Sequence, residues 1–165
     1  MDGSSIRAGD NLGADGESQE ACHQYREAIQ RNPAFVPARQ GLAEALFSMR
    51  QTDAAFEQLR EVLKTDPRNI TARYTLALYS IRENQIRSAI EELKVILNYE
   101  PGFALAHNLL GVAYAQSGNG PGAVSEFREA VRLDPGSLEA RNNLKLALDG
   151  MKKDAQKSIT KTDSH

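Results

Sequence analysis

The stretch that decides the fold is residues 104–136, ALAHNLLGVAYAQSGNGPGAVSEFREAVRLDPG. It predicts two short helices separated by a glycine-rich break, and a proline closes the segment. Apolar and small side chains recur at helical spacing on both sides of the break. They are Leu110, Gly111 and Tyr114 before it, and Ala123, Phe127 and Ala130 after it. We therefore expect a helical hairpin whose two helices pack through these side chains.

The same pattern recurs upstream at a fixed period. Pro33, Pro67, Pro101 and Pro135 follow one another at intervals of 34 residues. Other columns agree at this period: Ala21/Ala55/Ala89/Ala123, Tyr25/Leu59/Leu93/Phe127, Leu42/Leu76/Leu110/Leu144 and Ala43/Ala77/Gly111. Small residues allow two helix axes to approach closely, and the large residues fill the space beside them. The chain is thus predicted to contain three full units, at 36–69, 70–103 and 104–137.

The small residue in the first helix, the Ala-x3-Phe run in the second and the closing proline resemble the tetratricopeptide repeat (TPR) family. The resemblance covers residues 18–148. It implies an all-α fold, a right-handed α-α superhelix (TPR solenoid) built from three full helix-turn-helix repeats. The first helix of each repeat is called helix A here, and the second helix B. A helix B at 18–31 precedes the repeats, and a capping helix at 138–148 follows them.

Turn chemistry supports the phasing of the repeats. Asn69 and Ser137 precede helices as N-caps, and Pro37 suits a first helical turn. In the first repeat, helix A is expected around 37–49 and helix B around 53–64. The breaks between A and B are expected at 50–52, at 83–85 and, in a longer form, at 117–122.

The two ends of the chain differ from the repeats. Residues 1–17 contain four glycines, each costing about 1 kcal/mol in a helix relative to alanine. We expect a flexible lead-in there, and a degenerate first helix is the alternative; the helical signal begins at Ser18. Residues 149–165 are expected to form a polar tail into which the capping helix frays at 152–157. A polar end keeps a stacked array soluble.

One column is basic where the family favours a large apolar residue. It contains Arg39, Arg73, His107 and Arg141. We expect the aliphatic stems to pack against the helices and the charged heads to remain in water.

Composition is that of an ordinary globular protein: 41% of the 165 residues are hydrophobic, 25% are charged and the net charge is −2. Cys22 is the single cysteine, so it makes no intrachain disulfide, and its place in an apolar stripe predicts a small buried side chain. No apolar run is long enough to span a membrane, and no secretory signal is recognisable. A cytoplasmic location is the default expectation, unless a signal or anchor belongs to a longer form of the protein.

In the TPR family helix A lines the concave side, and the resemblance therefore implies a peptide-binding groove there. The predicted groove residues are Gln40, Glu44, Phe47, Tyr74, Thr75, Leu78, Ile81, Leu105, Asn108, Leu109, Val112, Asn142 and Asn143. Most of them stand in four main columns that contain no Lys or Arg: Pro37/Thr71/Leu105/Glu139, Gln40/Tyr74/Asn108/Asn142, Gly41/Thr75/Leu109/Asn143 and Glu44/Leu78/Val112/Leu146. A clamp for an acidic chaperone tail needs such cations, each making charge-assisted hydrogen bonds of roughly 1.5–3 kcal/mol. Nucleic acid binding is disfavoured for the same reason.

An apolar centre with amides on either side suits a neutral or apolar peptide or helix. We therefore expect a non-enzymatic scaffold or adaptor that binds a protein or peptide partner. Two structural readings stay open: the apolar residues pack between helices, and the asparagines are solvated surface.

No catalytic motif, metal-ligand spacing or cofactor motif is recognised, so no catalytic residue, no metal site and no cofactor is predicted. Two alternatives to the adaptor remain. One is a structural module that self-associates weakly through the N-terminal end of the array. The other is the regulatory or targeting segment of a larger protein.

Overall fold

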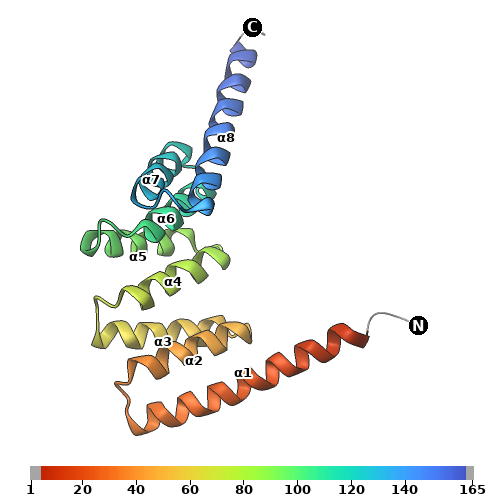
Figure 1. Cartoon of the computed structure of the whole chain (residues 1–165), viewed down its shortest axis with the longest axis vertical. Coiled ribbons are helices and arrows are strands. Elements are labelled where there is room, and N and C mark those ends of the chain that lie inside the picture. Colours follow the sequence, from red (N-terminus) through yellow and green to blue (C-terminus); the bar gives the residue numbers. More distant parts are fainter. Residues whose placement is uncertain (1–4, 163–165) are drawn as a thin grey trace. The chain divides into compact units, whose positions relative to one another are not determined.

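The structure is a computed structural model that describes residues 5–162, with side chains described for residues 16–156. The described residues form eight helices and no strand, which confirms the all-α prediction (Figure 1). The helices are α1 Ser5–Arg31, α2 Val36–Ser48, α3 Thr52–Thr65, α4 Ile70–Arg82, α5 Ile86–Tyr99, α6 Ala104–Gln116, α7 Gly120–Leu133 and α8 Leu138–Thr162.

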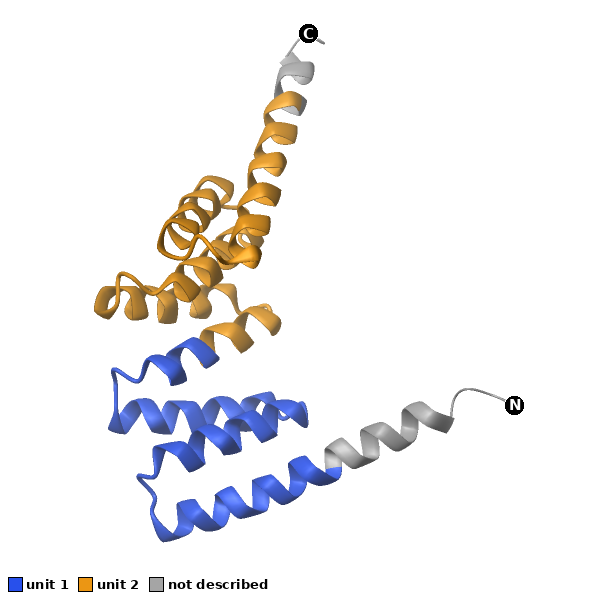
Figure 2. Cartoon of the chain, in the orientation of Figure 1, with its two compact units in different colours: residues 1–75 blue, residues 76–165 orange. Residues whose placement is uncertain are grey.

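The chain divides into two compact units, residues 1–75 and 76–165 (Figure 2). In unit 1, α2 packs against both α1 and α3. In unit 2, α6 packs against α5 and α7, and α8 packs against α7 with a smaller contact to α6. Within each unit, those of these helices that follow one another in the sequence therefore pack against each other, as the repeat pattern predicts.

The core of each unit is made by the columns that the sequence repeats. Ala55, Leu59 and Val62 of α3 are buried in unit 1. The matching residues of α5 and α7 are buried in unit 2: Ala89, Leu93, Ile96, Ala123, Phe127 and Ala130. Cys22 of α1 is also buried, as its position in the apolar stripe predicts.

Two glycines allow an aromatic ring to lie on a helix backbone. A Cβ added at Gly111 would lie 2.6 Å from the Phe127 ring, and a Cβ at Gly41 would lie 2.3 Å from the Tyr25 ring. Both distances are far below van der Waals contact. Glycine at these positions is therefore required by packing.

The turn from helix A to helix B is the same in each repeat. The second-last residue before helix B has a positive φ: 58° at Arg50, 58° at Asn84 and 80° at Gly118. In the first repeat the Gln51 amide donates to the Leu46 carbonyl at 2.9 Å and the Arg50 amide to the Phe47 carbonyl at 3.0 Å. These two bonds define a Schellman helix end.

The predicted longer break at 117–122 is wrong. Helix α6 ends at Gln116 and α7 begins at Gly120, which leaves a turn as short as the other two. Pro121 lies in the first turn of α7, where a missing amide proton costs nothing. The Asn119 side chain caps the helix by accepting from the Gly122 amide at 3.0 Å.

Both terminal helices extend beyond their expected limits. Helix α1 begins at Ser5, so Ser18 lies inside a helix and is not its N-cap. Helix α8 continues to Thr162, past the expected end of the capping helix at 148. The sequence holds no proline before Pro33 or after Pro135, and proline is the residue that stops a helix most strongly. The limits 18–148 for the repeat array stay a prediction.

Three members of the basic column bind backbone carbonyls, in hydrogen bonds that lie at the protein surface. Arg39 Nε donates to the Pro33 carbonyl at 2.9 Å, and Arg73 Nε to the Pro67 carbonyl at 3.0 Å. His107 Nε2 lies 2.8 Å from the Pro101 carbonyl. In each repeat this side chain therefore ties helix A to the proline turn that precedes it.

Candidate functional site

The predicted groove residues of unit 1 have different environments. Gln40 Nε2 donates to Asn69 Oδ1 at 3.0 Å, and the same oxygen caps α4 by accepting from the Ala72 amide at 2.9 Å. The cap predicted at Asn69 is thus confirmed. Gln40 is held against the start of the next helix A, so its amide already has a protein partner.

Phe47 packs inside the first repeat. Its side chain is buried, and its ring meets the Phe56 ring edge-on at a centroid distance of 5.6 Å. Edge-to-face contacts of this kind stabilise helix pairs. Glu44 is exposed, and Tyr74 and Thr75 are half-buried. Glu44, Tyr74 and Thr75 therefore offer more surface to a ligand than Phe47 does.

In unit 2 the amides form a cluster. Asn108 is 7% exposed. Its Nδ2 donates to Glu139 Oε1 at 2.9 Å, and its Oδ1 accepts from Asn143 Nδ2 at 3.0 Å. The cluster joins α6 to α8 through side chains, while Asn142 remains exposed. A buried polar group needs such partners, so Asn108 has an evident structural role.

Among the predicted groove residues of unit 2, Leu105 exposes the most apolar surface and is 51% exposed. Leu138 and Leu146 of α8 are more exposed, at 69% and 70%, and lie outside that set. Leu78 and Val112 are half-buried. Ile81 and Leu109 are 8% and 7% exposed and contribute mainly to packing.

Sequence reasoning missed a trough between α1 and α2 in unit 1. Its volume is about 380 Å³, and it is lined by Glu17, Ser18, Ala21, Tyr25, Gly41, Glu44, Ala45 and Ser48. Only Glu44 is among the predicted groove residues. Ala21 and Tyr25 of α1 belong to repeat columns that the sequence predicts to pack between helices, whereas Glu17 and Ser18 belong to none of these columns.

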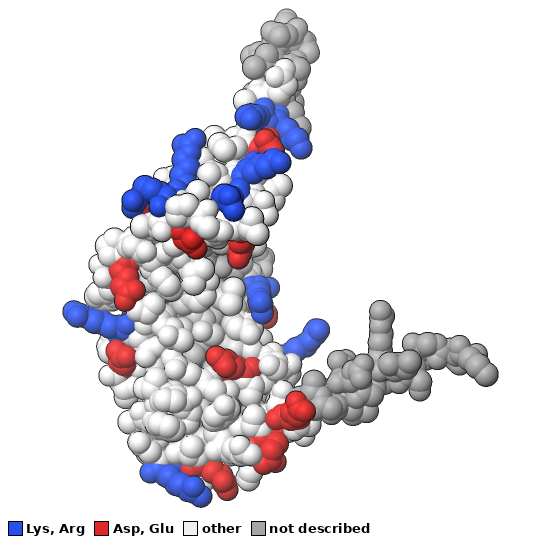
Figure 3. Space-filling view, viewed as in Figure 1, with Lys and Arg blue, Asp and Glu red and all other residues white. Residues whose placement is uncertain are grey.

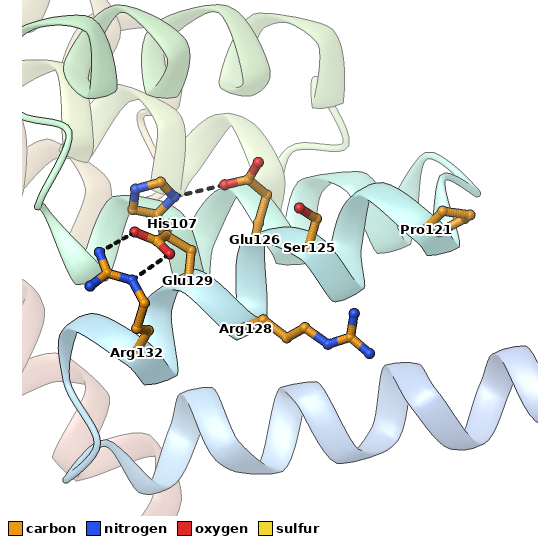
Figure 4. A pocket seen from close by; sticks show the side chains of 7 residues that line it. All are labelled: His107, Pro121, Ser125, Glu126, Arg128, Glu129 and Arg132. Atoms are coloured by element: carbon orange, nitrogen blue, oxygen red, sulfur yellow. Dashed lines mark hydrogen bonds and ion pairs between the residues drawn. The ribbon is translucent and has the colours of Figure 1, made fainter.

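A second hollow lies on α7 beside His107 (Figure 4). It measures about 410 Å³ and is lined by His107, Pro121, Ser125, Glu126, Arg128, Glu129 and Arg132. His107 Nδ1 lies 2.7 Å from Glu126 Oε2, and Arg132 binds Glu129 through two bonds of 2.6 and 2.8 Å. In Figure 4 the Arg128 head points away from these pairs.

The ion pairs of this hollow account for its pKa shifts. The hydrogen bond from Arg132 lowers the pKa of the Glu129 carboxyl, and the charges of Arg132 and His107 act in the same direction. The same pair raises the pKa of Arg132. Arg132 is exposed and Glu129 is half-buried, and we assign no binding role to this pair.

Within the described residues, no group of three or more His, Cys, Asp or Glu side chains could hold a metal ion. In the same part of the chain, no helix has both the length and the apolar character to cross a membrane.

Three family models for the tetratricopeptide repeat match the chain, at residues 6–70, 46–113 and 104–137. Together they cover all three predicted repeats and α1. The chain belongs to the tetratricopeptide repeat family. No curated protein matches it.

Solved structures with this fold are similar to the chain at low sequence identity. A crystal structure of MamA is 20% identical with a TM-score of 0.76, covering 100% of this chain and 99% of its own. YrrB, a TPR protein with an unusual peptide-binding site, is 20% identical with a TM-score of 0.71, covering 79% and 67%. The first TPR of Spaghetti (RPAP3), bound to an HSP90 peptide, is 16% identical with a TM-score of 0.67, covering 71% and 93%.

Proposed function

We propose that this protein is a non-enzymatic scaffold that binds a neutral or apolar peptide or helix of a protein partner along its A helices. The observation that carries the proposal is the exposed apolar surface on those helices, with Leu105 half in water on α6. An apolar side chain gains about 25 cal/mol for each Å² that a partner removes from water. Leu78 and Val112 add to that surface, and Tyr74 supplies an aromatic ring with a polar end.

The similar structures support a binding role of this kind. YrrB has a peptide-binding site, and the first TPR of Spaghetti binds the HSP90 peptide SRMEEVD. Three of the last four residues of that peptide are acidic, whereas the main groove columns of this chain contain no Lys or Arg. We therefore propose a different class of ligand for this protein.

In this proposal most of the predicted groove amides hold helices in place and do not contact the peptide. Asn108 and Asn143 bind each other and hold α6 and α8 in place. Asn142, which is exposed, is the amide that is free to meet a peptide backbone among these three. The other amide of the predicted set, Gln40, positions the start of α4.

A peptide selection followed by substitution tests the proposal. Twelve-residue random peptides displayed on phage are selected on the immobilised full chain, and binding of the enriched peptides is measured by fluorescence anisotropy. Groove variants are the Tyr74→Asp/Leu78→Asp double change and Leu105→Asp. We expect at least one of them to weaken binding about tenfold, the effect of losing about 1.4 kcal/mol of apolar contact.

Leu138→Asp is the matched control, because Leu138 is 69% exposed and lies outside the predicted groove columns. It should leave binding unchanged, and circular dichroism should show all variants folded. Failure to enrich any peptide, or equal weakening by the control, would contradict the proposal. Light scattering at several protein concentrations separates this role from self-association, for which mass should rise with concentration.

A further inference from the structure

The trough in unit 1 has an apolar floor and a polar end. Tyr25 lies over Gly41 at one end. Ala21 of α1 and Ala45 of α2 follow along the floor, and their small side chains create the hollow. Helices α1 and α2 run antiparallel (Figure 1). The polar lining residues Ser18, Ser48 and Glu17 therefore lie toward the end of the trough opposite Tyr25 and Gly41.

Within the described residues no helix A packs in front of α1, and this leaves the trough open. In the third repeat, α6 covers the helix-B aromatic Phe127, which is 3% exposed. Tyr25 holds the same position in α1 but is half-buried. Helix α1 is one continuous helix from Ser5, so no turn brings a covering helix back over Tyr25 within the described residues.

The charge of the trough has one sign. Glu17 and Glu44 are exposed, and no Lys or Arg lines the trough. No ion pair joins either carboxylate to another described side chain. On the face of unit 1 drawn in Figure 3, acidic side chains also gather over α1. An apolar floor that leads to two carboxylates is complementary to a side chain with an aliphatic stem and a cationic head.

We propose that this trough binds a lysine or arginine side chain of the partner peptide, with the stem on Ala21 and Ala45 and the head between Glu17 and Glu44. This inference rests on the proposed function and narrows it to the apolar class of peptide, in which one basic residue is flanked by apolar residues. Long basic side chains bury their stems on apolar surface while the charge stays solvated or paired. The two serine hydroxyls add acceptors for the same head.

The repeats themselves show how the site could be closed. The position of Ser48 in the first repeat is Arg82 in the second. An arginine at position 48 would lie four residues after Glu44, the spacing at which opposite charges pair on a helix. Ser48→Arg should therefore neutralise Glu44 from within α2 and leave the apolar floor intact.

The test uses the same phage library in parallel on the wild-type chain and on the Glu17→Gln/Glu44→Gln variant. The wild-type pool should become enriched in peptides with Lys or Arg at one fixed position, and the variant pool should lose that preference. For a synthetic peptide from the wild-type pool, replacing that residue with norleucine should weaken binding about tenfold. The double variant should do the same, and Ser48→Arg should weaken binding severalfold, as expected for one charge-assisted contact.

The control is Glu57→Gln/Glu61→Gln on α3, which changes the net charge equally but lies outside the trough. It should leave the binding constant unchanged. Enriched peptides without a basic position, or a basic preference that persists in the Glu17/Glu44 variant, would overturn this inference and leave peptide binding intact. A selection that enriches no peptide would instead contradict the proposed function itself.

Discussion

At the scale of single residues, packing depends on which residue of helix A faces which residue of helix B in the same repeat. The first and second repeats place alanine and leucine in the two columns where the third repeat places Gly111 and Phe127. All of these residues are buried. A larger ring in one column is thus matched by a smaller residue in the other, as close packing requires.

Gly111→Ala should lower the free energy of unfolding by about 1–3 kcal/mol, because its Cβ would overlap the Phe127 ring. Urea denaturation followed by circular dichroism measures this loss. Phe127→Leu in the same chain should restore part of it, since Ala77 with Leu93 is the combination that the second repeat uses. A double variant no more stable than Gly111→Ala would contradict the paired-column explanation.

At the scale of elements, the turn between helices A and B is set by one residue with a positive φ. Arg50, Asn84 and Gly118 hold this position in the three repeats. Glycine adopts the left-handed conformation without strain, asparagine tolerates it, and a longer side chain does so at a cost.

Arg50→Gly should raise the free energy of unfolding by about 0.5–1 kcal/mol, and Asn84→Gly by less. Gly118→Ala should lower it by about 1 kcal/mol. The midpoint of urea denaturation reports all three changes. Gly102→Ala is the control, since its φ is not positive and a Cβ there would meet no atom within 4 Å. A loss of stability in Arg50→Gly would show that the arginine side chain matters more than the backbone.

At the scale of the whole molecule, the chain consists of two compact units. In a repeat protein each helix contacts mainly its neighbours in sequence, so damage at one place is felt locally before it spreads. The helix contacts within each unit follow this rule, with the smaller contact between α6 and α8 as the exception.

Leu59→Ala, at a side chain 1% exposed in α3, should remove about 2–5 kcal/mol by leaving a cavity. Amide hydrogen exchange should then accelerate in α1, α2 and α3 more than in α6, α7 and α8. Leu93→Ala, its counterpart in unit 2, should produce the opposite distribution. Equal acceleration along the chain in both variants would show one cooperative unit.

The sequence by itself determined the family, the phase of the repeats and most of the core. Prolines at intervals of 34 residues and buried columns such as Ala55/Ala89/Ala123 carry this information locally, because helix pairing depends on side chains a few turns apart. The sequence was less informative at turns. The glycines predicted a break that extends to residue 122, but the Asn119 cap and Pro121 allow α7 to begin at Gly120.

The tertiary structure alone decided which candidate residues are exposed and which are occupied by contacts within the protein. Phe47 and Asn108 have the spacing of groove residues, but contacts with Phe56 and with Glu139 and Asn143 occupy them. The trough exists because α1 continues straight and leaves Tyr25 partly uncovered. Periodicity shows which side of a helix a residue lies on. It does not show which residue of another helix that side chain contacts, because the contact depends on how the two helices pack in space.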